Sequence, residues 1–536
     1  MTQRIAGGAG TSDCEADVLL IGGGPAGCWA AITAASHGAR VVLVDKGYCG
    51  SSGATAPSGT GVWYVSPDPT KRAEAMQSRD VLGGRLADHG WMRRVLDRTY
   101  GNVNLLAEWG YPFPRDDHGV ERRDSLQGPE YMRLMRRRVK EAGVKILDHS
   151  PALELLVDED GAAAGAAGVR RQHGESWTVR SKAVVMATGG CAFLSKALGT
   201  NVLTGDGYLM AAEAGAELSG MEFSNAYAIA PAFASVTKTL FYNWATFTYR
   251  DGSPVPGASS RHRSLIARAL LEGHEVFAQI DKADEATRIA MRGAQPNFFL
   301  PFDRAGIDPF TQRFPVTLRL EGTVRGTGGL RIVDEGCATT VPGLYAAGDA
   351  ATRELICGGF TGGGSHNAAW AMSSGAWAGA SAAEFSQQIG DAAHRHLTRS
   401  GTVVLAPRDG HELDADALIR TVQAEVFPYD KNYFRTGSSL AQSLERLDEI
   451  WRDVRAAGAS KVERVVKARE AAAMLATARW MYSSAIVRAE TRGMHKREDF
   501  PQEDRTQHHT IAVGGLDEIW TTPVPVARAA EAGIAA

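Results

Sequence analysis

The sequence predicts an α/β fold of the Rossmann type that is interrupted by an inserted domain and followed by a helical region. Three observations support this fold class: a strand–glycine turn–helix–strand unit at residues 17–45, a change of pattern between 221 and 320, and long helical periodicity between 410 and 495. At 536 residues the chain is too long for one simple core, so we expect two or three domains.

The glycine turn near the N-terminus has the pattern of a dinucleotide-binding site. The apolar run Val18–Ile21 leads into Gly22-x-Gly24-x-x-Gly27 and an alanine-rich helix, and a second apolar run ends at Asp45. The glycines allow a tight turn, a close approach of the backbone to a pyrophosphate and close packing of helix on sheet. The helix N-terminus favours phosphate, and a carboxylate at the position of Asp45 accepts ribose hydroxyls. The turn alone leaves open which dinucleotide binds.

The segments after Asp45 divide the chain further. A small-residue loop, 46–56, is expected to reach the cofactor, the alternative being a mobile surface loop. An antiparallel meander is expected at 152–178, and an aromatic-rich insertion begins near 221. The predicted division is a dinucleotide-binding domain in two parts, a cap inserted between them, a helical domain and an extended tail. The dinucleotide-binding domain is expected at 15–220 and 325–385, and the cap at 221–324. The helical domain is expected at 386–510 and the tail at 511–536.

Composition and charge restrict the function classes. A net charge of −3 gives no electrostatic reason to expect nucleic acid or an anionic membrane as a partner. The six cysteines contain no CxxC pair, which argues against a metal site and against an iron–sulfur cluster held by this chain alone. They fit a reducing compartment. Because we find no apolar signal core and no spanning segment, we expect a cytoplasmic protein without a transmembrane segment, and an oligomer is compatible with the sequence.

Four separated elements together resemble a known family. They are the turn Gly22–Gly27 with its Asp45, then Ala187–Gly190, Thr204–Gly207 and Gly343–Asp349. In this order and spacing they resemble the flavoprotein subunits of the fumarate reductase/succinate dehydrogenase family. That family also contains L-aspartate oxidase, the 3-ketosteroid dehydrogenases and the adenylylsulfate reductase alpha subunit. The run 488–501 resembles the family's C-terminal signature, so the resemblance spans about residues 15–510. It implies an FAD-binding Rossmann-type domain, an α+β capping domain and a helical C-terminal domain.

The resemblance also implies the residues that contact FAD. Asp206 and Asp349 would hold the ribityl and ribose region, and residues 365–367 would begin a helix aimed at the flavin. The alternative for His366 is a buried histidine packed on a loop. The implied contacts are Gly22, Gly24, Pro25, Ala26, Gly27, Asp45, Lys46, Ser51, Ser52, Gly53, Thr55, Leu155, Ala187, Thr188, Gly189, Asp206, Gly348, Asp349, Ser365, His366 and Asn367.

Departures from the family pattern bear on the substrate. Ala54 stands where succinate-oxidising members attach FAD through a histidine, so non-covalent FAD is expected. The family's two dicarboxylate-binding histidines and one arginine correspond to Tyr227, Val324 (beside Arg325) and Thr361. A dianion would therefore lack charged donors, and succinate and fumarate are not expected as substrates.

One family element for catalysis is retained in part. The run Arg263–Arg268 resembles the cap helix whose arginine delivers a proton, which makes Arg263 a candidate proton donor or substrate clamp. The alternative is a solvent-facing arginine on an amphipathic helix. Tyr242, Tyr249 and His366 complete the set of candidate catalytic residues.

These features favour an FAD-dependent oxidoreductase that transfers a hydride between FAD and a small organic substrate under a mobile cap. Only one dinucleotide fingerprint is present, so electrons would pass to or from oxygen, a quinone, a ferredoxin-type carrier or a partner subunit. An alternative is an electron-transfer subunit that works only with an iron–sulfur partner. A flavin-dependent monooxygenase is a third hypothesis, which no NAD(P)H-linked motif supports.

Overall fold

The centre of the N-terminal region is a five-stranded parallel sheet with the strand order β17–β10–β2–β3–β6. The computed structural model describes residues 12–115, 118–237, 239–361, 363–389, 395–405, 412–458 and 462–526. Alternate residues of β2 belong to two different hydrophobic clusters, so both faces of the sheet are covered. The strands are Val18–Ile21 (β2), Val41–Val44 (β3), Lys145–Leu147 (β6), Ala183–Met186 (β10) and Leu344–Ala346 (β17).

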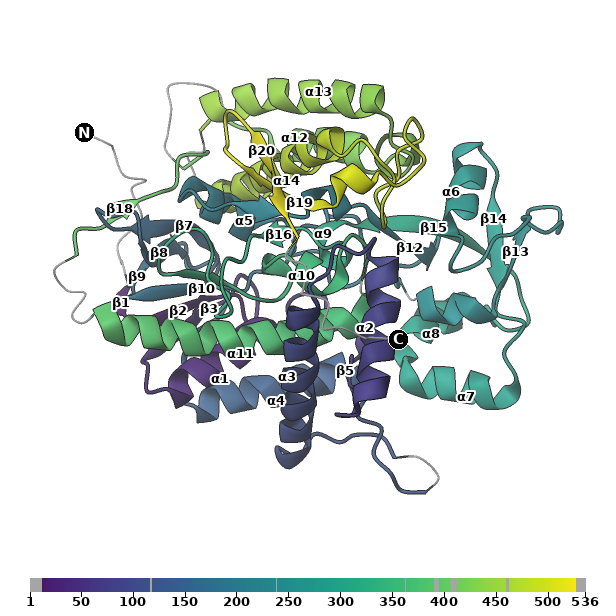
Figure 1. Cartoon of the computed structure of the whole chain (residues 1–536), viewed down its shortest axis with the longest axis horizontal. Helices are drawn as coiled ribbons and strands as arrows, with labels where there is room; N and C mark the ends of the chain where they lie inside the picture. The colour runs from purple at the N-terminus through teal and green to yellow at the C-terminus, as the bar shows by residue number, and fades with distance from the viewer. Residues whose placement is uncertain are drawn as a thin grey trace, which may run out of the picture.

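Two helices of small residues pack against each other beside this sheet. Helix α1 (Pro25–Ser36) follows the glycine turn, and α11 (Gly363–Ile389) runs alongside it, as Figure 1 shows. A Cβ atom on Gly375 or Gly379 would lie 2.4 or 2.3 Å from a carbonyl oxygen of α1, so this close approach requires glycine at both positions. The same region contains α2 (Pro69–Leu82), α3 (His89–Glu108) and α4 (Gly128–Glu141).

A second sheet has the order β1–β9–β8–β7–β18. The antiparallel meander predicted for 152–178 is confirmed, because β7, β8 and β9 pair in sequence. Strands β1 and β18 extend it from distant parts of the chain. The strands are Ser12–Glu15 (β1), Ala152–Val157 (β7), Ala163–Val169 (β8), Ser176–Arg180 (β9) and Thr398–Arg399 (β18).

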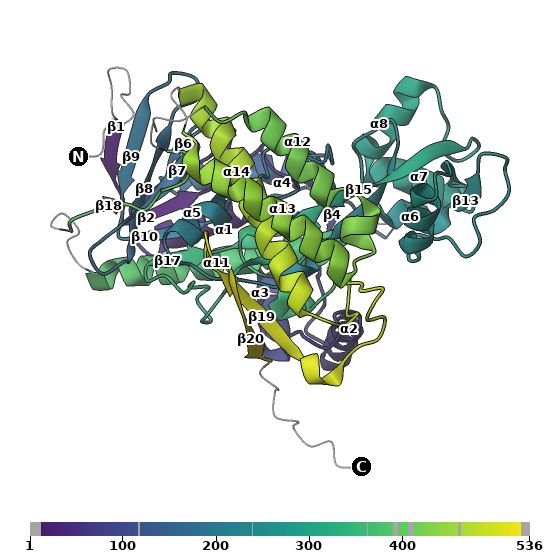
Figure 2. The same ribbon diagram turned by 90° about the horizontal axis from the view of Figure 1, so that it is seen from above.

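The aromatic-rich insertion forms an α+β cap at one side of the molecule (Figures 1 and 2). Its antiparallel sheet has the order β12–β15–β14–β13. The strands β12 and β15, which come first and last in the sequence of the cap, are neighbours in this sheet. The two chain crossings into the cap therefore lie side by side. Its elements are Ala226–Pro231 (β12), Thr246–Tyr249 (β13), Arg263–Leu271 (α6), Val276–Gln279 (β14), Glu285–Ala294 (α7), Pro296–Ala305 (α8) and Phe314–Glu321 (β15).

Helices α12 (Ala415–Val426), α13 (Gly437–Ala456) and α14 (Val462–Val487) form the C-terminal helical region. They lie along the top of the molecule in the view of Figure 1. Helix α14 packs against both of the others and against α5 (Asp206–Glu213), which joins this region to the first domain.

The extended tail predicted for 511–536 is wrong as far as the described residues go. Strands β19 (His509–Gly514) and β20 (Trp520–Pro525) form a hairpin, and β19 also pairs with β11 (Leu218–Ser219). Strand β20 is at the edge of its sheet, where a proline that lacks an N–H donor is tolerated, and its two prolines hid the strand pattern. Residues 527–536 of the predicted tail lie outside the described residues.

The C-terminal signature forms a buried network of ion pairs. The side chains of Arg488, Glu490 and Glu222 are fully buried, and Arg488 donates to both carboxylates at 2.8 and 2.9 Å. Arg492 donates to Glu490 at 2.7 Å and to the carbonyl oxygen of Gly84. Buried charges are tolerated only when they are paired. Through these pairs the network joins the C-terminal segment to the base of the cap and to the turn between α2 and α3.

Glu354 is a buried carboxyl next to this network, on the short helix α10 (Glu354–Cys357). Ser219 donates a hydrogen bond to Oε1, whereas Oε2 has no partner among the described residues. Burial and the nearby charge of Glu222 raise the pKa of Glu354 to about 8. The folded protein therefore holds a proton that the unfolded chain releases near pH 4.3.

We predict that Glu354→Gln removes one component of the pH dependence of stability. The folded state binds more protons than the unfolded state between about pH 5 and pH 8, so the free energy of unfolding of the wild type falls as pH rises there. As pH rises through this range, the free energy of unfolding of the variant should increase relative to that of wild type by up to about 1.4 kcal/mol per pH unit. Chemical denaturation at several pH values measures this difference, with the exposed Glu108→Gln as control. Parallel curves for wild type and Glu354→Gln would contradict the prediction.

Candidate functional site

A cavity that is partly open to solvent lies along the carboxyl ends of four strands of the central sheet. Its walls include 21–26 after β2, 44–47 after β3, 187–189 after β10 and 347–349 after β17. Ligands of open α/β sheets bind at this edge, where turns and helix N-termini offer free backbone groups. The glycine elements picked out in the sequence thus meet at one cavity.

The first glycine turn has two glycines that serve packing and one that faces open space. Gly22 has φ +109°, and a Cβ there would lie 2.2 Å from the carbonyl oxygen of Ala187. A Cβ on Gly27 would lie 1.8 Å from the carbonyl oxygen of Gly22, whereas one on Gly24 would meet no atom within 4 Å. Gly24 precedes α1 without a side-chain cap, so the free N–H groups of α1 are available to a phosphate at the cavity.

Asp45 joins the glycine turn to the small-residue loop. Its buried carboxylate accepts hydrogen bonds from Gly23 N at 2.6 Å, Gly47 N at 2.7 Å and Ser52 Oγ at 2.8 Å. A carboxylate has about four acceptor sites, so one remains for a ligand hydroxyl.

Lys46 and Asp206 line the cavity as an ion pair. Lys46 Nζ lies 2.5 Å from Asp206, 2.8 Å from Thr204 Oγ1 and 2.9 Å from Glu470 on α14. Burial favours a lower pKa for Lys46, but the two carboxylates outweigh it and raise this pKa. The Lys46 ammonium is therefore committed to protein partners.

The short helix α9 (Gly322–Arg325) forms the floor of the cavity. The guanidinium of Arg353 is fully buried and lies 2.5 Å from Asp349 Oδ1. It also donates to the carbonyl oxygens of Thr323 at 2.6 Å and of Gly326. Asn367 Nδ2 donates to the carbonyl oxygen of Val324 at 2.9 Å. Helix α9 is too short to pair its backbone carbonyl groups within the helix. Arg353 and Asn367 pair with them instead, and these hydrogen bonds fix α9 against the cavity.

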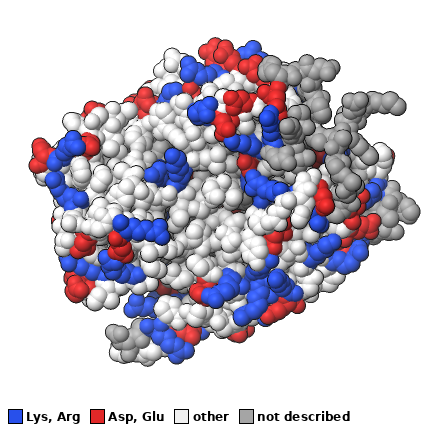
Figure 3. Space-filling model, turned by 180° about the vertical axis from the view of Figure 1, so that it is seen from behind, with Lys and Arg blue, Asp and Glu red and all other residues white. Residues whose placement is uncertain are grey.

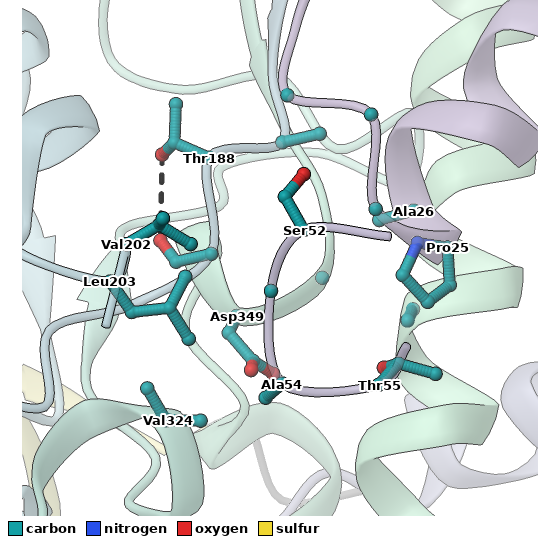
Figure 4. Close-up of a pocket in the computed structure, with 18 of the residues that line it drawn as sticks. Pro25, Ala26, Ser52, Ala54, Thr55, Thr188, Val202, Leu203, Val324 and Asp349 are labelled. Atoms are coloured by element: carbon teal, nitrogen blue, oxygen red, sulfur yellow. Dashed lines mark hydrogen bonds between the residues drawn. The ribbon is translucent and has the colours of Figure 1, made fainter. Parts of the chain in front are cut away.

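Figure 4 shows how the loop after Asp45 crosses the cavity. Ser52, Ala54 and Thr55 project from this loop between the start of α1 and an apolar wall that contains Val202 and Leu203. Val324 of α9 adds a further apolar group. Apolar side chains beside polar loop atoms suit a ligand that has both an aromatic ring and polar groups.

A second, smaller cavity lies between the first cavity and the cap, and we name it the cap chamber. It shares Ala54, Ser58, Val324 and Arg325 with the first cavity. The remaining lining comes from 198–200, 236–237, 295–298 and Glu321. A ligand in the first cavity and a molecule in the cap chamber would therefore meet at the shared residues.

Three hydrogen bonds from the α7–α8 corner of the cap hold it against the first domain. Gln295 Oε1 accepts from Gly59 N at 3.2 Å, and Asn297 Nδ2 donates to Pro57 O at 2.5 Å. Gln127 Nε2 of the first domain donates to the carbonyl oxygen of Ala294 at 2.5 Å.

Most of the predicted contact residues line the first cavity. Those that do are Gly22, Gly24, Pro25, Ala26, Asp45, Lys46, Ser52, Gly53, Thr55, Ala187, Thr188, Gly189, Asp206, Gly348, Asp349 and Asn367.

Five predicted contacts do not line it. Gly27 packs inside the turn, and Ser51 is exposed and bonded to Tyr48 O. Leu155 is buried in β7, with its carbonyl oxygen bonded to Ser400, because alternate strand residues point to the core. Ser365 Oγ lies 3.1 Å from His366 Nδ1, and the His366 ring packs on Trp63, with centroids 4.4 Å apart.

Three of the candidate catalytic residues, Arg263, Tyr242 and Tyr249, line neither cavity. Tyr242 is buried in the cap core between Phe247 and Phe314. The Tyr249 ring packs on His274, and Arg263 hydrogen-bonds to Tyr433 of the C-terminal region. The density of aromatic residues in the insertion reflects core packing of the cap.

Sequence reasoning missed several lining residues. Val202 and Leu203 stand immediately before the motif Thr204–Gly207, which was a usable signal. Pro151 and Ala152 line the cavity just before Leu155. Glu321 lies at the end of a cap strand, and no local pattern marks it.

Two other kinds of site are absent from the described segments. No group of three or more His, Cys, Asp or Glu in these segments is arranged to hold a metal ion. None of their helices is long and apolar enough to cross a bilayer. On the face shown in Figure 3, the described acidic and basic side chains are interspersed around an uncharged central area.

Two family descriptions match this chain. The FAD binding domain matches residues 17–231, and the fumarate reductase flavoprotein C-terminal domain matches residues 424–529. The first match contains the glycine turn and three of the four strands that end at the cavity, β2, β3 and β10. The second contains α13, α14 and three members of the buried ion network, Arg488, Glu490 and Arg492.

Similar proteins cover nearly the whole chain. L-aspartate oxidase of Streptomyces coelicolor is 28% identical over 92% of this chain and 90% of its own. The fumarate reductase flavoprotein subunit of Mycobacterium tuberculosis is 26% identical over 91% of this chain and 92% of its own. The structure of E. coli quinol fumarate reductase shares the fold, with a TM-score of 0.80 and 20% identity. The match covers 96% of this chain and 97% of that chain.

The matched domains, the full-length relatives and the cavity at the strand ends agree with one another. The expected α/β fold with an inserted cap and a helical C-terminal region is confirmed, and so is FAD as the cofactor. The chain contains the FAD binding domain and the fumarate reductase flavoprotein C-terminal domain, is similar over nearly its whole length to flavoproteins of the fumarate reductase and L-aspartate oxidase type, and is an FAD-dependent oxidoreductase.

Proposed function

We propose that FAD lies in the first cavity and exchanges a hydride with a small organic substrate in the cap chamber. The observation that carries this proposal is that the two cavities share Ala54, Ser58, Val324 and Arg325. When bound, FAD supplies two-electron chemistry, and the protein supplies orientation, exclusion of water and charge.

The residues of the first cavity fit FAD. Gly24 leaves the backbone open to a pyrophosphate, and Asp45 keeps one acceptor site for a ribose hydroxyl. Asn367 Oδ1 is buried without a partner among the described residues, so it can accept a hydrogen bond from the cofactor. The N-terminus of α11 places its positive dipole end nearby, which stabilises negative charge on the flavin ring. We place the ring near Ala54 and Val324 and the adenine near Pro151 and Met210.

The cap chamber lacks the positive charge that a dicarboxylate needs. Tyr227 is buried and donates to the carbonyl oxygens of Val426 and Phe427. Val324 is apolar, and Arg263 bonds to Tyr433. Arg325 is the one Lys or Arg side chain among the described residues that line the chamber. One cation neutralises at most half of a dianion, so we propose a substrate other than succinate or fumarate.

Asp45→Ala is predicted to yield largely FAD-free protein. The substitution removes three hydrogen bonds that hold the glycine turn and the small-residue loop, as well as the acceptor for the ribose. A loss of about 1.4 kcal/mol already weakens binding tenfold, so we expect at least that loss of affinity. The ratio of flavin absorbance to protein measures it.

The control for this variant is Asp17→Ala. Asp17 precedes the neighbouring strand β2, at the opposite edge of the central sheet from Asp45, and pairs with Arg40 and Lys182 away from the cavity. Full FAD occupancy in Asp45→Ala would rule out the ribose assignment.

FAD is predicted to be bound without a covalent link. Ala54, at the position of the family's flavin-linking histidine, lines both cavities and has no nucleophilic atom. Acid precipitation of the flavoprotein should therefore release all FAD to the supernatant. A yellow pellet that keeps its absorbance after washing would contradict this prediction.

The electron partner separates two forms of this proposal. The relative from Mycobacterium tuberculosis is named a flavoprotein subunit, which favours an electron-transfer subunit with an iron–sulfur partner as the second candidate. We predict that the isolated chain, once reduced by its substrate, is reoxidised rapidly by oxygen in stopped-flow measurements. Slow reoxidation that a ferredoxin accelerates would favour the second candidate instead.

We place the enzyme in the cytoplasm. All six cysteines are free thiols, and five of them are buried. Free thiols in this number are typical of a reducing compartment.

A further inference from the structure

The cap chamber contains one carboxylate and one guanidinium, from Glu321 and Arg325, and no other charged side chain lines it among the described residues. Glu321 ends β15, and Arg325 ends α9 four residues later. Both therefore lie where the chain leaves the cap, next to the boundary with the first cavity. The chamber is neutral as a whole but strongly dipolar.

The two charges do not satisfy each other. Arg325 Nε lies 3.9 Å from Glu321 Oε1, well beyond the 2.7–2.9 Å of a charge-assisted hydrogen bond. Glu321 Oε1 accepts from Thr237 Oγ1 at 2.7 Å, and Oε2 has no hydrogen bond within the described segments. Only 29% of the Arg325 side chain is exposed to solvent. The guanidinium nevertheless makes no hydrogen bond to any described residue. Both groups keep donor and acceptor capacity for a ligand.

This arrangement selects among ligand classes. A dicarboxylate would bring its second charge toward Glu321, which is repulsive, and a purely apolar molecule would desolvate both charges without pairing them. A molecule with one anionic and one cationic group pairs with both residues. The apolar wall of Leu198, Val236 and Phe298 remains for an uncharged side chain.

We propose that the cap chamber binds a small zwitterion of the α-amino acid class, with its carboxylate on Arg325 and its ammonium on Glu321. This proposal rests on the proposed function, because it names the substrate class for that same site. The carbon that carries both charged groups would then lie by Val324, at the boundary with the FAD cavity.

The test is equilibrium dialysis of the FAD-loaded full chain, without oxygen, against four probes. They are L-leucine, 4-methylpentanoate (leucine without its ammonium), 3-methylbutylamine (leucine without its carboxylate) and succinate. L-leucine should bind at least about tenfold more tightly than each of the others, because only it pairs with both charges.

Two variants assign the groups. Glu321→Gln should weaken L-leucine about tenfold or more and leave 4-methylpentanoate within about twofold. Arg325→Gln should weaken L-leucine and 4-methylpentanoate and leave 3-methylbutylamine within about twofold. Glu285→Gln and Arg304→Gln, on exposed positions of the cap helices α7 and α8, are the matched controls and should change nothing.

Three results would overturn the inference: tighter binding of succinate than of L-leucine, equal binding of L-leucine to wild type and Glu321→Gln, or no binding of any probe to the flavin-loaded chain. A chain that holds no flavin would instead contradict the proposed function. FAD content is therefore measured on the same samples before dialysis.

Discussion

The buried guanidinium of Arg353 is the interaction on which both cavities depend. It pairs with Asp349 after strand β17 and donates to carbonyl oxygens of α9, a helix of four residues that cannot satisfy its own backbone. Asp349 compensates the buried positive charge, and the carbonyl oxygens of Thr323 and Gly326 accept from Nη2. Because α9 carries Val324 and Arg325, Arg353 positions the boundary between the FAD cavity and the cap chamber.

The cap is attached at the same place. Strand β15 ends at Glu321 and leads directly into α9, so the chain passes from cap to cavity floor without a linker. Thr237, which follows β12 in the chain, donates a hydrogen bond to Glu321, and Ala226 at the start of β12 bridges to Gly322. Gln295 and Asn297 also line the chamber and bond to the first domain at Gly59 and Pro57. Movement of the cap about the crossings would open those contacts while α9 stays fixed by Arg353.

Local patterns made the cofactor half of the site predictable. Each strand that ends in a glycine turn was visible as a short apolar run followed by small residues, and such turns meet wherever parallel strands end together. Gly22, Asp45, Thr188 and Asp349 were found in this way, and all of them line the first cavity. The periodicity of residues 152–178 likewise sufficed to predict the meander.

The substrate half depends on contacts that no local pattern encodes. Tyr242 of the aromatic-rich insertion was a candidate catalytic residue, and its side chain packs in the core of the cap. Arg353 stands in an ordinary loop sequence, and only the fold shows that it is buried. Glu321 becomes a site residue because β15 ends at the chamber. Burial and long-range pairing decided these positions.

A crystal structure of the FAD-loaded protein tests the central claim most directly. The claim predicts the isoalloxazine ring at the residues shared by the two cavities, Ala54, Val324 and Arg325, with the adenine near Pro151 and Met210 and the cap chamber open beside the ring. An isoalloxazine ring at the Pro151 end, or one separated from the cap chamber by protein, would contradict it.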